Sequence, residues 1–150
     1  MVISNLNIKL IEDRLGFISK AVERLKRVSY LDKKDFLDDD SPAIAESYLR
    51  RSLEAIFDIG RHIIAKTPGK GIVEYKEIAS ALGDRGVITK QLAEKLRLMA
   101  GYRNRLVHFY HEVNDRELYQ IIKNDLADIE VFVKEMKTFI ESYRQNKSGC

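Results

Sequence analysis

The feature that most constrains the fold is the spacing of apolar residues, which recur every three or four positions along most of the chain. In the first segment, the series is Ile8, Ile11, Leu15, Ile18, Val22 and Leu25. Such a series lines one face of an α-helix, with charged residues on the other faces. The same period predicts helices over about 5–28, from Ser41 to the breaker at 67–71, over about 75–82, from Thr89 through Leu106, and from about Asn114.

Connections between the long predicted helices are short, which favours antiparallel neighbours. We therefore predict an all-α fold, namely an up-and-down four-helix bundle with one short additional helix. Residues 1–150 form a single predicted domain, because this length suits one core. A charge-rich connector is expected at about 29–40 and a frayed tail at about 145–150. Ser41 followed by Pro42 suits the start of the second long helix.

Composition excludes several classes of protein. The one cysteine, Cys150, excludes a disulfide scaffold and a cysteine-built zinc site, and it fits a reducing compartment. No apolar run approaches the roughly 18 residues that span a bilayer, so no membrane association is expected. Residues 1–10 are too polar for a secretory signal, and we expect the cytoplasm. The net charge of +3 permits a nucleic-acid ligand without requiring one.

Arg103 breaks the apolar pattern of the fourth long segment, since it falls on the stripe after Leu96 and Met99. A buried arginine is costly unless it is paired or binds an anion. One interpretation is structural: the side chain reaches the edge of the bundle or pairs with a buried carboxylate such as Asp58. The other is that it faces a partner surface or a ligand.

Residues 102–111 combine a guanidinium, an imidazole, an amide and a phenol. Arg103 presents a planar fork that matches a phosphate, and the imidazole of His108 is a group that can accept or donate a proton. Together they have the chemistry to cleave a phosphodiester without a metal. On a regular helix, however, the two side chains point roughly 140° apart, whereas Arg103 and Tyr110 share a face. The site therefore needs either a helix end near Val107 or a second subunit.

The spacing of Arg103, His108 and Tyr110 is R-x4-H-x-Y, and Asn104 adds a polar residue directly after the arginine. In this motif the chain resembles the HepT-like toxins of the HEPN superfamily. The resemblance covers nearly the whole chain. It includes the helix order, the Tyr-Lys-Glu-Ile run from Tyr75, the Gly-Val-Ile turn from Gly86 and the sequence Leu-Ala-Glu-Lys-Leu from Leu92.

The resemblance implies the toxin component of a type II toxin–antitoxin system, acting as a metal-independent endoribonuclease on RNA at a homodimer cleft. It implies that Arg103 and His108 are catalytic and that Asn104 supports them. The partner implied is an MntA-like nucleotidyltransferase antitoxin, which would silence the toxin by AMPylation of Tyr110. No cofactor and no metal are expected. The alternative is a non-catalytic helical module that binds a nucleotide or a partner and forms a complex with a nucleotidyltransferase.

Other polar residues allow weaker hypotheses. His108 and His111, with Glu112, have a spacing that metal ligands use, but no third ligand is placed. His62 is expected to face solvent or an interface. Five arginines either extend a phosphate-binding surface or belong to solvated helix faces: Arg50, Arg51, Arg61, Arg97 and Arg105. Three tyrosines are expected to pack rather than stack on bases: Tyr48, Tyr75 and Tyr119.

Overall fold

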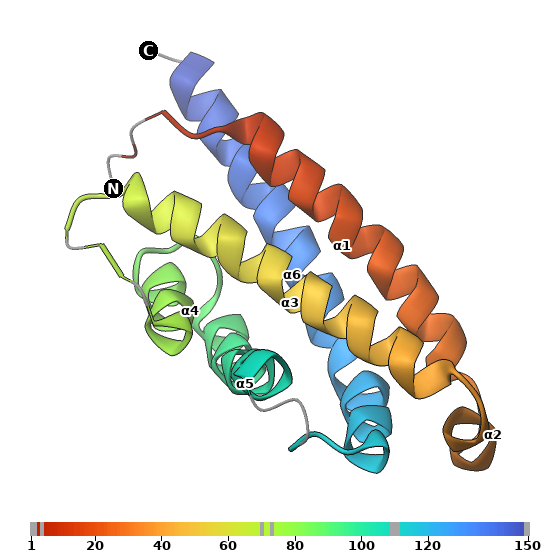
Figure 1. The fold of residues 1–150 in the computed structure, drawn as a ribbon. Helices are drawn as coiled ribbons and strands as arrows, with labels where there is room; N and C mark the ends of the chain where they lie inside the picture. The colour runs from red at the N-terminus through yellow and green to blue at the C-terminus, as the bar shows by residue number, and fades with distance from the viewer. Residues whose placement is uncertain (1–2, 4, 70, 73, 109–111, 149–150) are drawn as a thin grey trace.

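The computed structural model describes residues 3, 5–69, 71–72, 74–108 and 112–148 (Figure 1). These residues form six α-helices and no strand, which confirms the predicted all-α fold. The helices are α1 (Ile8–Ser29), α2 (Lys33–Asp38), α3 (Ser41–Ala65), α4 (Tyr75–Asp84), α5 (Lys90–His108) and α6 (Asp115–Ser148). Among the described residues, none of these helices has an apolar stretch that would let it cross a membrane.

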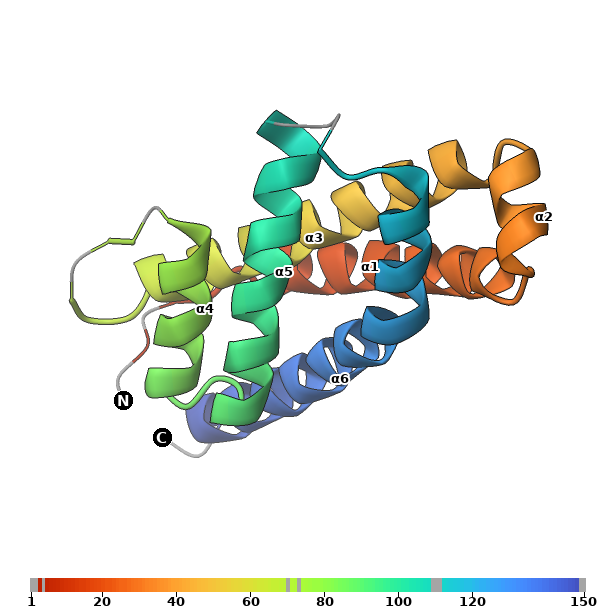
Figure 2. The same ribbon diagram turned by 90° about the horizontal axis from the view of Figure 1, so that it is seen from below.

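The helices form two groups. The long helices α1, α3 and α6 lie along one another, and α1 packs against both of the others (Figure 1). The pair α4 and α5 runs across α3 at a steep angle (Figure 2). The carboxyl end of α5 therefore projects at the side of the long helices, next to the start of α6 (Figure 2).

The buried faces are those that the periodicity predicts. Five of the six predicted stripe residues in the first helix are buried, and Ile8 is half-buried. The predicted stripes of α3 and α6 also reach the core, with Phe139 half-buried at the edge. The fully buried rings of Phe57 and Phe132 belong to the same core. Burial of this apolar surface is what stabilises helices whose own propensities are ordinary.

The predicted connector contains the short helix α2, which packs against α3 and α6. Its one fully buried residue, Phe36, lies 5.0 Å from the ring of Tyr119 on α6, measured between centroids.

The start of α3 differs in detail from the prediction. The N-cap residue is Asp40 rather than Ser41, and Asp39 Oδ1 accepts hydrogen bonds from the backbone N–H and the hydroxyl of Ser41, the first residue of the helix.

The ends of the molecule are tied together by polar contacts. The backbone N–H of Leu6 donates to the hydroxyl of Tyr143 at 3.0 Å, and Arg144 forms an ion pair with Glu12 at 2.8 Å. Lys147 also donates to the side chain of Asn5. These contacts hold α6 against the first segment, and the helix continues through Ser148, into the stretch predicted to fray.

The turn between α4 and α5 brings these two helices very close. Gly86 adopts a φ of +76°, a conformation that other residues rarely take. At Gly83, an added Cβ atom would lie 2.7 Å from the Cβ of Ala93 on α5. Thr89 then caps α5 by accepting a hydrogen bond from the backbone N–H of Leu92 at 3.2 Å. The fold therefore fixes α5, which carries the motif, firmly against α4.

Candidate functional site

Arg103 lies on α5 where the helix faces α3 and α4, and only 12% of its side chain is exposed. Its guanidinium carbon lies 4.1 Å from the centroid of the Tyr75 ring, at the start of α4. Its Nη2 lies 3.9 Å from Oε1 of Glu54 on α3. Its Nε is buried and makes no hydrogen bond within the described part of the chain. A buried guanidinium that still has an N–H group without a hydrogen-bond partner is suited to bind an anion.

The structural interpretation of Arg103 named the wrong carboxylate. Asp58 is exposed and pairs with Arg14 of α1 at 3.7 Å. Glu54, one helical turn earlier on α3, is the carboxylate beside Arg103. At 3.9 Å, this ion pair is at the long end of the range, so it neutralises Arg103 only in part.

Asn104 is half-buried and contacts the arginine that precedes it. The Nη1 of Arg103 donates to Oδ1 of Asn104 at 3.4 Å, which is a long hydrogen bond. This contact with the amide of Asn104 helps to hold the guanidinium of Arg103 in its position. The supporting role predicted for Asn104 stays a proposal.

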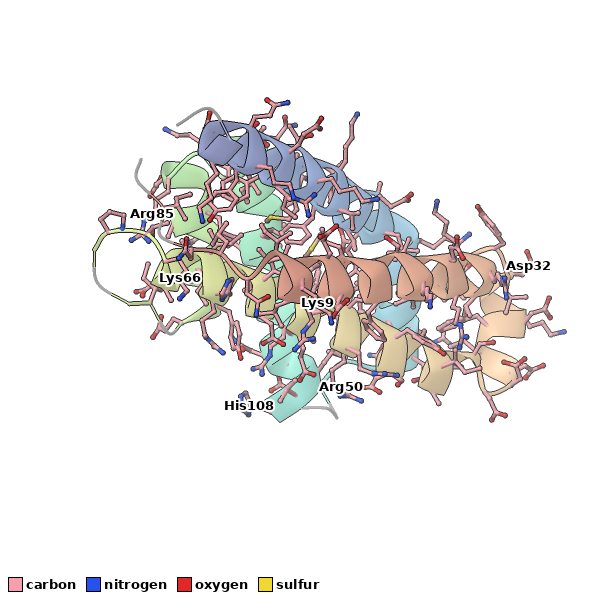
Figure 3. All side chains as sticks on the ribbon, turned by 90° about the horizontal axis from the view of Figure 1, so that it is seen from above. Lys9, Asp32, Arg50, Lys66, Arg85 and His108 are labelled. Carbon is pink, nitrogen blue, oxygen red and sulfur yellow. The ribbon has the colours of Figure 1, made fainter. Side chains whose placement is uncertain are left out.

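His108 is the last residue of α5 and is exposed. The helix is continuous from Arg103 to His108, so these two side chains leave it in different directions. Figure 3 labels His108 at the end of α5 and Arg50 of α3 on the same side of the molecule. Tyr110 and His111 lie outside the described residues. α5 ends one residue beyond Val107, but His108 still belongs to the helix, so this helix end does not turn its side chain toward Arg103. A site completed by a second subunit stays a proposal.

Arg105 has a structural role that the sequence did not reveal. Its two terminal nitrogens each donate to Glu117 of α6 at 2.7 Å, and Nη2 also donates to the carbonyl oxygen of Glu112 at 3.0 Å. The hydrogen bonds from Arg105 lower the pKa of Glu117, and those to Glu117 raise the pKa of Arg105. Asn114 caps α6 by accepting from the N–H of Glu117 at 2.8 Å. Arg105 therefore ties the last turn of α5 to the start of α6.

The other predicted phosphate-binding arginines differ in their surroundings. Arg50 forms an ion pair one helical turn away on its own helix, Arg51 lies over the ring of Phe17, and Arg97 donates to the hydroxyl of Ser80. Arg61 lies over the ring of Tyr75, with 5.2 Å from its guanidinium carbon to the ring centroid. Within the described residues, Arg61 forms no ion pair.

Three further titratable residues, Tyr102, Asp125 and His62, have pKa values shifted by their surroundings. Tyr102 lies next to Arg103 in sequence, and its pKa is raised by burial and then by Asp125 of α6. The pKa of Asp125 is itself raised, first by burial and then by Asp128. On α3, Nε2 of His62 accepts a hydrogen bond from the backbone N–H of Asn7 at 2.9 Å, and burial lowers the pKa of His62. His62 therefore helps to fix the start of α1.

A groove of about 710 Å³ lies beside the end of α5, between the starts of α3 and α6. Its polar lining is mainly acidic, and Arg50 is the one basic residue against five carboxylates: Asp39, Asp40, Glu46, Glu54 and Asp115. This charge disfavours an RNA phosphate in the groove itself. Among the described residues, no three His, Cys, Asp or Glu side chains gather as a metal site would require.

Comparison with protein families matches residues 18–136 to the family described as "Ribonuclease HepT-like". A tRNA nuclease HepT from Aphanizomenon flos-aquae is 27% identical over 139 residues, which are 91% of this chain and 94% of the relative. An mRNA nuclease HepT from Shewanella oneidensis is 30% identical over 133 residues, which are 85% of this chain and 96% of the relative.

Similarity extends to a solved structure of a toxin with its antitoxin. The structure contains a tri-AMPylated HEPN toxin from Shewanella oneidensis in complex with an MNT antitoxin. It superimposes with a TM-score of 0.71 at 27% sequence identity, and the match covers 86% of this chain and 97% of that chain. The family match over residues 18–136 includes all of α5, the helix that carries both Arg103 and His108.

Proposed function

The chain belongs to the ribonuclease HepT-like family, and we propose on this basis that it is the toxin of a toxin–antitoxin pair, acting as an endoribonuclease on RNA. The observation that carries the proposal is the state of Arg103. Its guanidinium is stacked on Tyr75, only partly neutralised by Glu54, and has a buried Nε with no protein partner among the described residues. These are the properties of a phosphate-binding group.

In the proposed reaction, the 2′-hydroxyl of a ribose attacks the adjacent phosphorus while the bond from phosphorus to the 5′-oxygen breaks. The proton of the 2′-hydroxyl passes to a base, and the 5′-oxygen that leaves takes a proton from an acid. His108 performs one of these two transfers and solvent water performs the other. Arg103 stabilises the negative charge that develops on the phosphate oxygens. The products are a 2′,3′-cyclic phosphate and a 5′-hydroxyl. The motif supplies a proton-transfer group, His108, and a charge-stabilising group, Arg103, so the proposed cleavage requires no metal.

The proposed active form is a homodimer. Arg103 faces α3 and α4, whereas His108 is exposed at the end of α5, so one chain does not direct both groups at one phosphate. A second copy that brings its His108 to the Arg103 of the first resolves this geometry. We also propose that residues 1–150 form a single domain and that the protein acts in the cytoplasm.

The proposed partner is an MntA-like nucleotidyltransferase. It would transfer AMP from ATP to the phenolic oxygen of Tyr110 and release pyrophosphate. The related toxin from Shewanella oneidensis is described as tri-AMPylated and in complex with its antitoxin, which supports this proposal. An AMP group on Tyr110 adds a phosphodiester anion that competes with RNA for Arg103. Incubation with ATP and the cognate enzyme should add AMP mass to the protein but not to Tyr110→Phe.

Cleavage of RNA by the purified protein in EDTA tests the enzymatic proposal. Activity should persist in EDTA and fall on the order of 10²- to 10⁴-fold in His108→Ala. Arg103→Ala should fall at least as far, with an unchanged circular dichroism spectrum. Arg24→Ala is the control, because Arg24 also stacks on a tyrosine, Tyr48, at 5.2 Å. Full activity in His108→Ala, or inactivity of the wild-type dimer on every RNA tested, would contradict the proposal.

A further inference from the structure

The ring of Tyr75 joins three helices at the base of the candidate site. Phe57 of α3 is fully buried and contacts this ring edge-on, with centroids 5.2 Å apart and an angle of 69° between the planes. The guanidinium carbon of Arg103 on α5 lies 4.1 Å from the ring centroid, and that of Arg61 on α3 lies 5.2 Å from it. Two cations from different helices therefore share one aromatic ring.

The position of Tyr75 is rigid because α4 lies tightly on α3. An added Cβ atom at Gly60 would lie 2.8 Å from Cγ2 of Ile78, so the glycine lets α4 approach to this distance. Tyr75 is the first residue of α4, and Phe57 supports it from beneath. A ring held in this way fixes the planes of the guanidinium groups that stack on it.

The two arginines have little negative charge to balance them. Glu54 lies 3.9 Å from Arg103, and Arg61 forms no ion pair with the described residues. Both guanidinium carbons lie close to one ring centroid, so the cations cannot be farther apart than the sum of these two distances. The ring holds each cation, but the two repel each other. A polyanion that contacts both would remove that repulsion.

We propose that Tyr75 positions Arg103 for catalysis and that Arg61 is a second phosphate-binding residue for the same RNA strand. The inference rests on the proposed ribonuclease function and extends its site from α5 to α3 and α4. Stacking leaves the N–H edges of a guanidinium open for hydrogen bonds to phosphate oxygens. Arg103 contacts the phosphate that is cleaved, and Arg61, which is exposed, contacts a neighbouring phosphate.

The salt dependence of RNA binding distinguishes a phosphate-binding role of Arg61 from a purely structural role. The probe is a short labelled single-stranded RNA of mixed sequence, and the protein carries His108→Ala so that the RNA stays intact. Each phosphate contact contributes about 0.7 to the slope of log affinity against log salt for single strands. Arg61→Gln should therefore reduce the slope by roughly 0.7. Arg24→Gln is the matched control, because Arg24 stacks on Tyr48 at the same distance of 5.2 Å.

The control lies well outside the proposed site, since Tyr48 and Arg61 are separated by about 20 Å along α3. Arg24→Gln should leave the salt slope unchanged. In the protein with His108 intact, Arg61→Gln should raise KM by up to about fivefold with little change in kcat, as expected for one screened ionic contact. An unchanged slope and KM in Arg61→Gln would overturn the role of Arg61.

Variants of Tyr75 test the positioning role. Tyr75→Phe keeps the ring and should keep kcat within about twofold, because the cation–π attraction needs the ring face and not the hydroxyl. Tyr75→Leu removes the ring and should lower kcat about tenfold or more, as a misplaced catalytic group does. Thermal unfolding shows whether Tyr75→Leu remains folded. Wild-type kcat in folded Tyr75→Leu would overturn the inference, whereas a wild-type protein that cleaves no RNA would instead contradict the proposed function.

Discussion

Substitution of Gly83 by alanine tests how closely α4 and α5 must approach. The new methyl group would lie 2.7 Å from the Cβ of Ala93, whereas carbon atoms in contact prefer about 3.5–4.0 Å. Neither methyl group can rotate away, so the two helices must separate by nearly 1 Å at this point. Overpacking of this kind costs about 1–3 kcal/mol, and the helix propensity of alanine returns up to about 1 kcal/mol. We expect a net loss of about 1–2 kcal/mol.

The assay is thermal and urea unfolding of Gly83→Ala, with Gly16→Ala as the control. Gly16 lies within α1, and its added Cβ would meet nothing within 4 Å. Gly16→Ala should therefore stabilise the protein by about 0.5–1 kcal/mol, which raises Tm by a few degrees. The two alanine variants should shift Tm in opposite directions, although both replace a helical glycine.

A double-mutant cycle checks the stated cause. Ala93→Gly removes the methyl group that Gly83→Ala would meet, so the double variant should lose less stability than the sum of the two single variants. If Gly83→Ala is as stable as the wild type, or if the two substitutions are simply additive, the close contact does not limit the packing of α4 on α5. The physical argument would then be refuted.

Three further predictions concern stability. Phe36→Ala should cost about 3–5 kcal/mol in urea unfolding, because the ring is fully buried between helices. Glu117, whose pKa is lowered chiefly by its hydrogen bonds from Arg105, contributes stability above its unfolded-state pKa that is lost as the pH falls through the folded value. Glu117→Gln should therefore reduce stability by about 1 kcal/mol at pH 7 and less in acid titrations. The pKa of His62 is also lowered, so its contribution should be lost as the pH falls below about 6.5. His62→Gln, which can still accept from the N–H of Asn7, should flatten the pH dependence of Tm between about 5 and 7.

Periodicity was sufficient to predict the long helices because each of them buries a continuous stripe. In α1, Ile11, Leu15 and Leu25 are all at most 3% exposed, as the spacing requires. The short helix α2 gave no such signal, since its six residues contain one fully buried side chain. Its helical state depends on contacts between Phe36 and Tyr119, which are distant in sequence. The apolar pattern within a short segment cannot predict a helix that is stabilised mainly by contacts with distant parts of the chain.

The candidate site was predictable only as far as it lies within one helix. Arg103 was found because a charge interrupts an apolar stripe. The surroundings that give Arg103 its properties come from α3 and α4, and neither Glu54 nor Tyr75 has a spacing that relates it to Arg103. Tyr75 was expected to pack, and it does pack on Phe57. The sequence could not show that its ring also carries two guanidinium groups.

The contact between the first and last helices sets when this protein can fold during synthesis. α1 leaves the ribosome first, but it packs on α6 as well as on α3, and the hydrogen bond from Leu6 to Tyr143 spans 137 positions. Core residues such as Phe132 and Met136 arrive with the last helix. Contacts of such long sequence separation form late, and early segments must wait for them. Translation that stops before α6 should therefore leave α1 packed on α3 alone, and an RNA-cleaving fold would be completed only after the last helix has emerged.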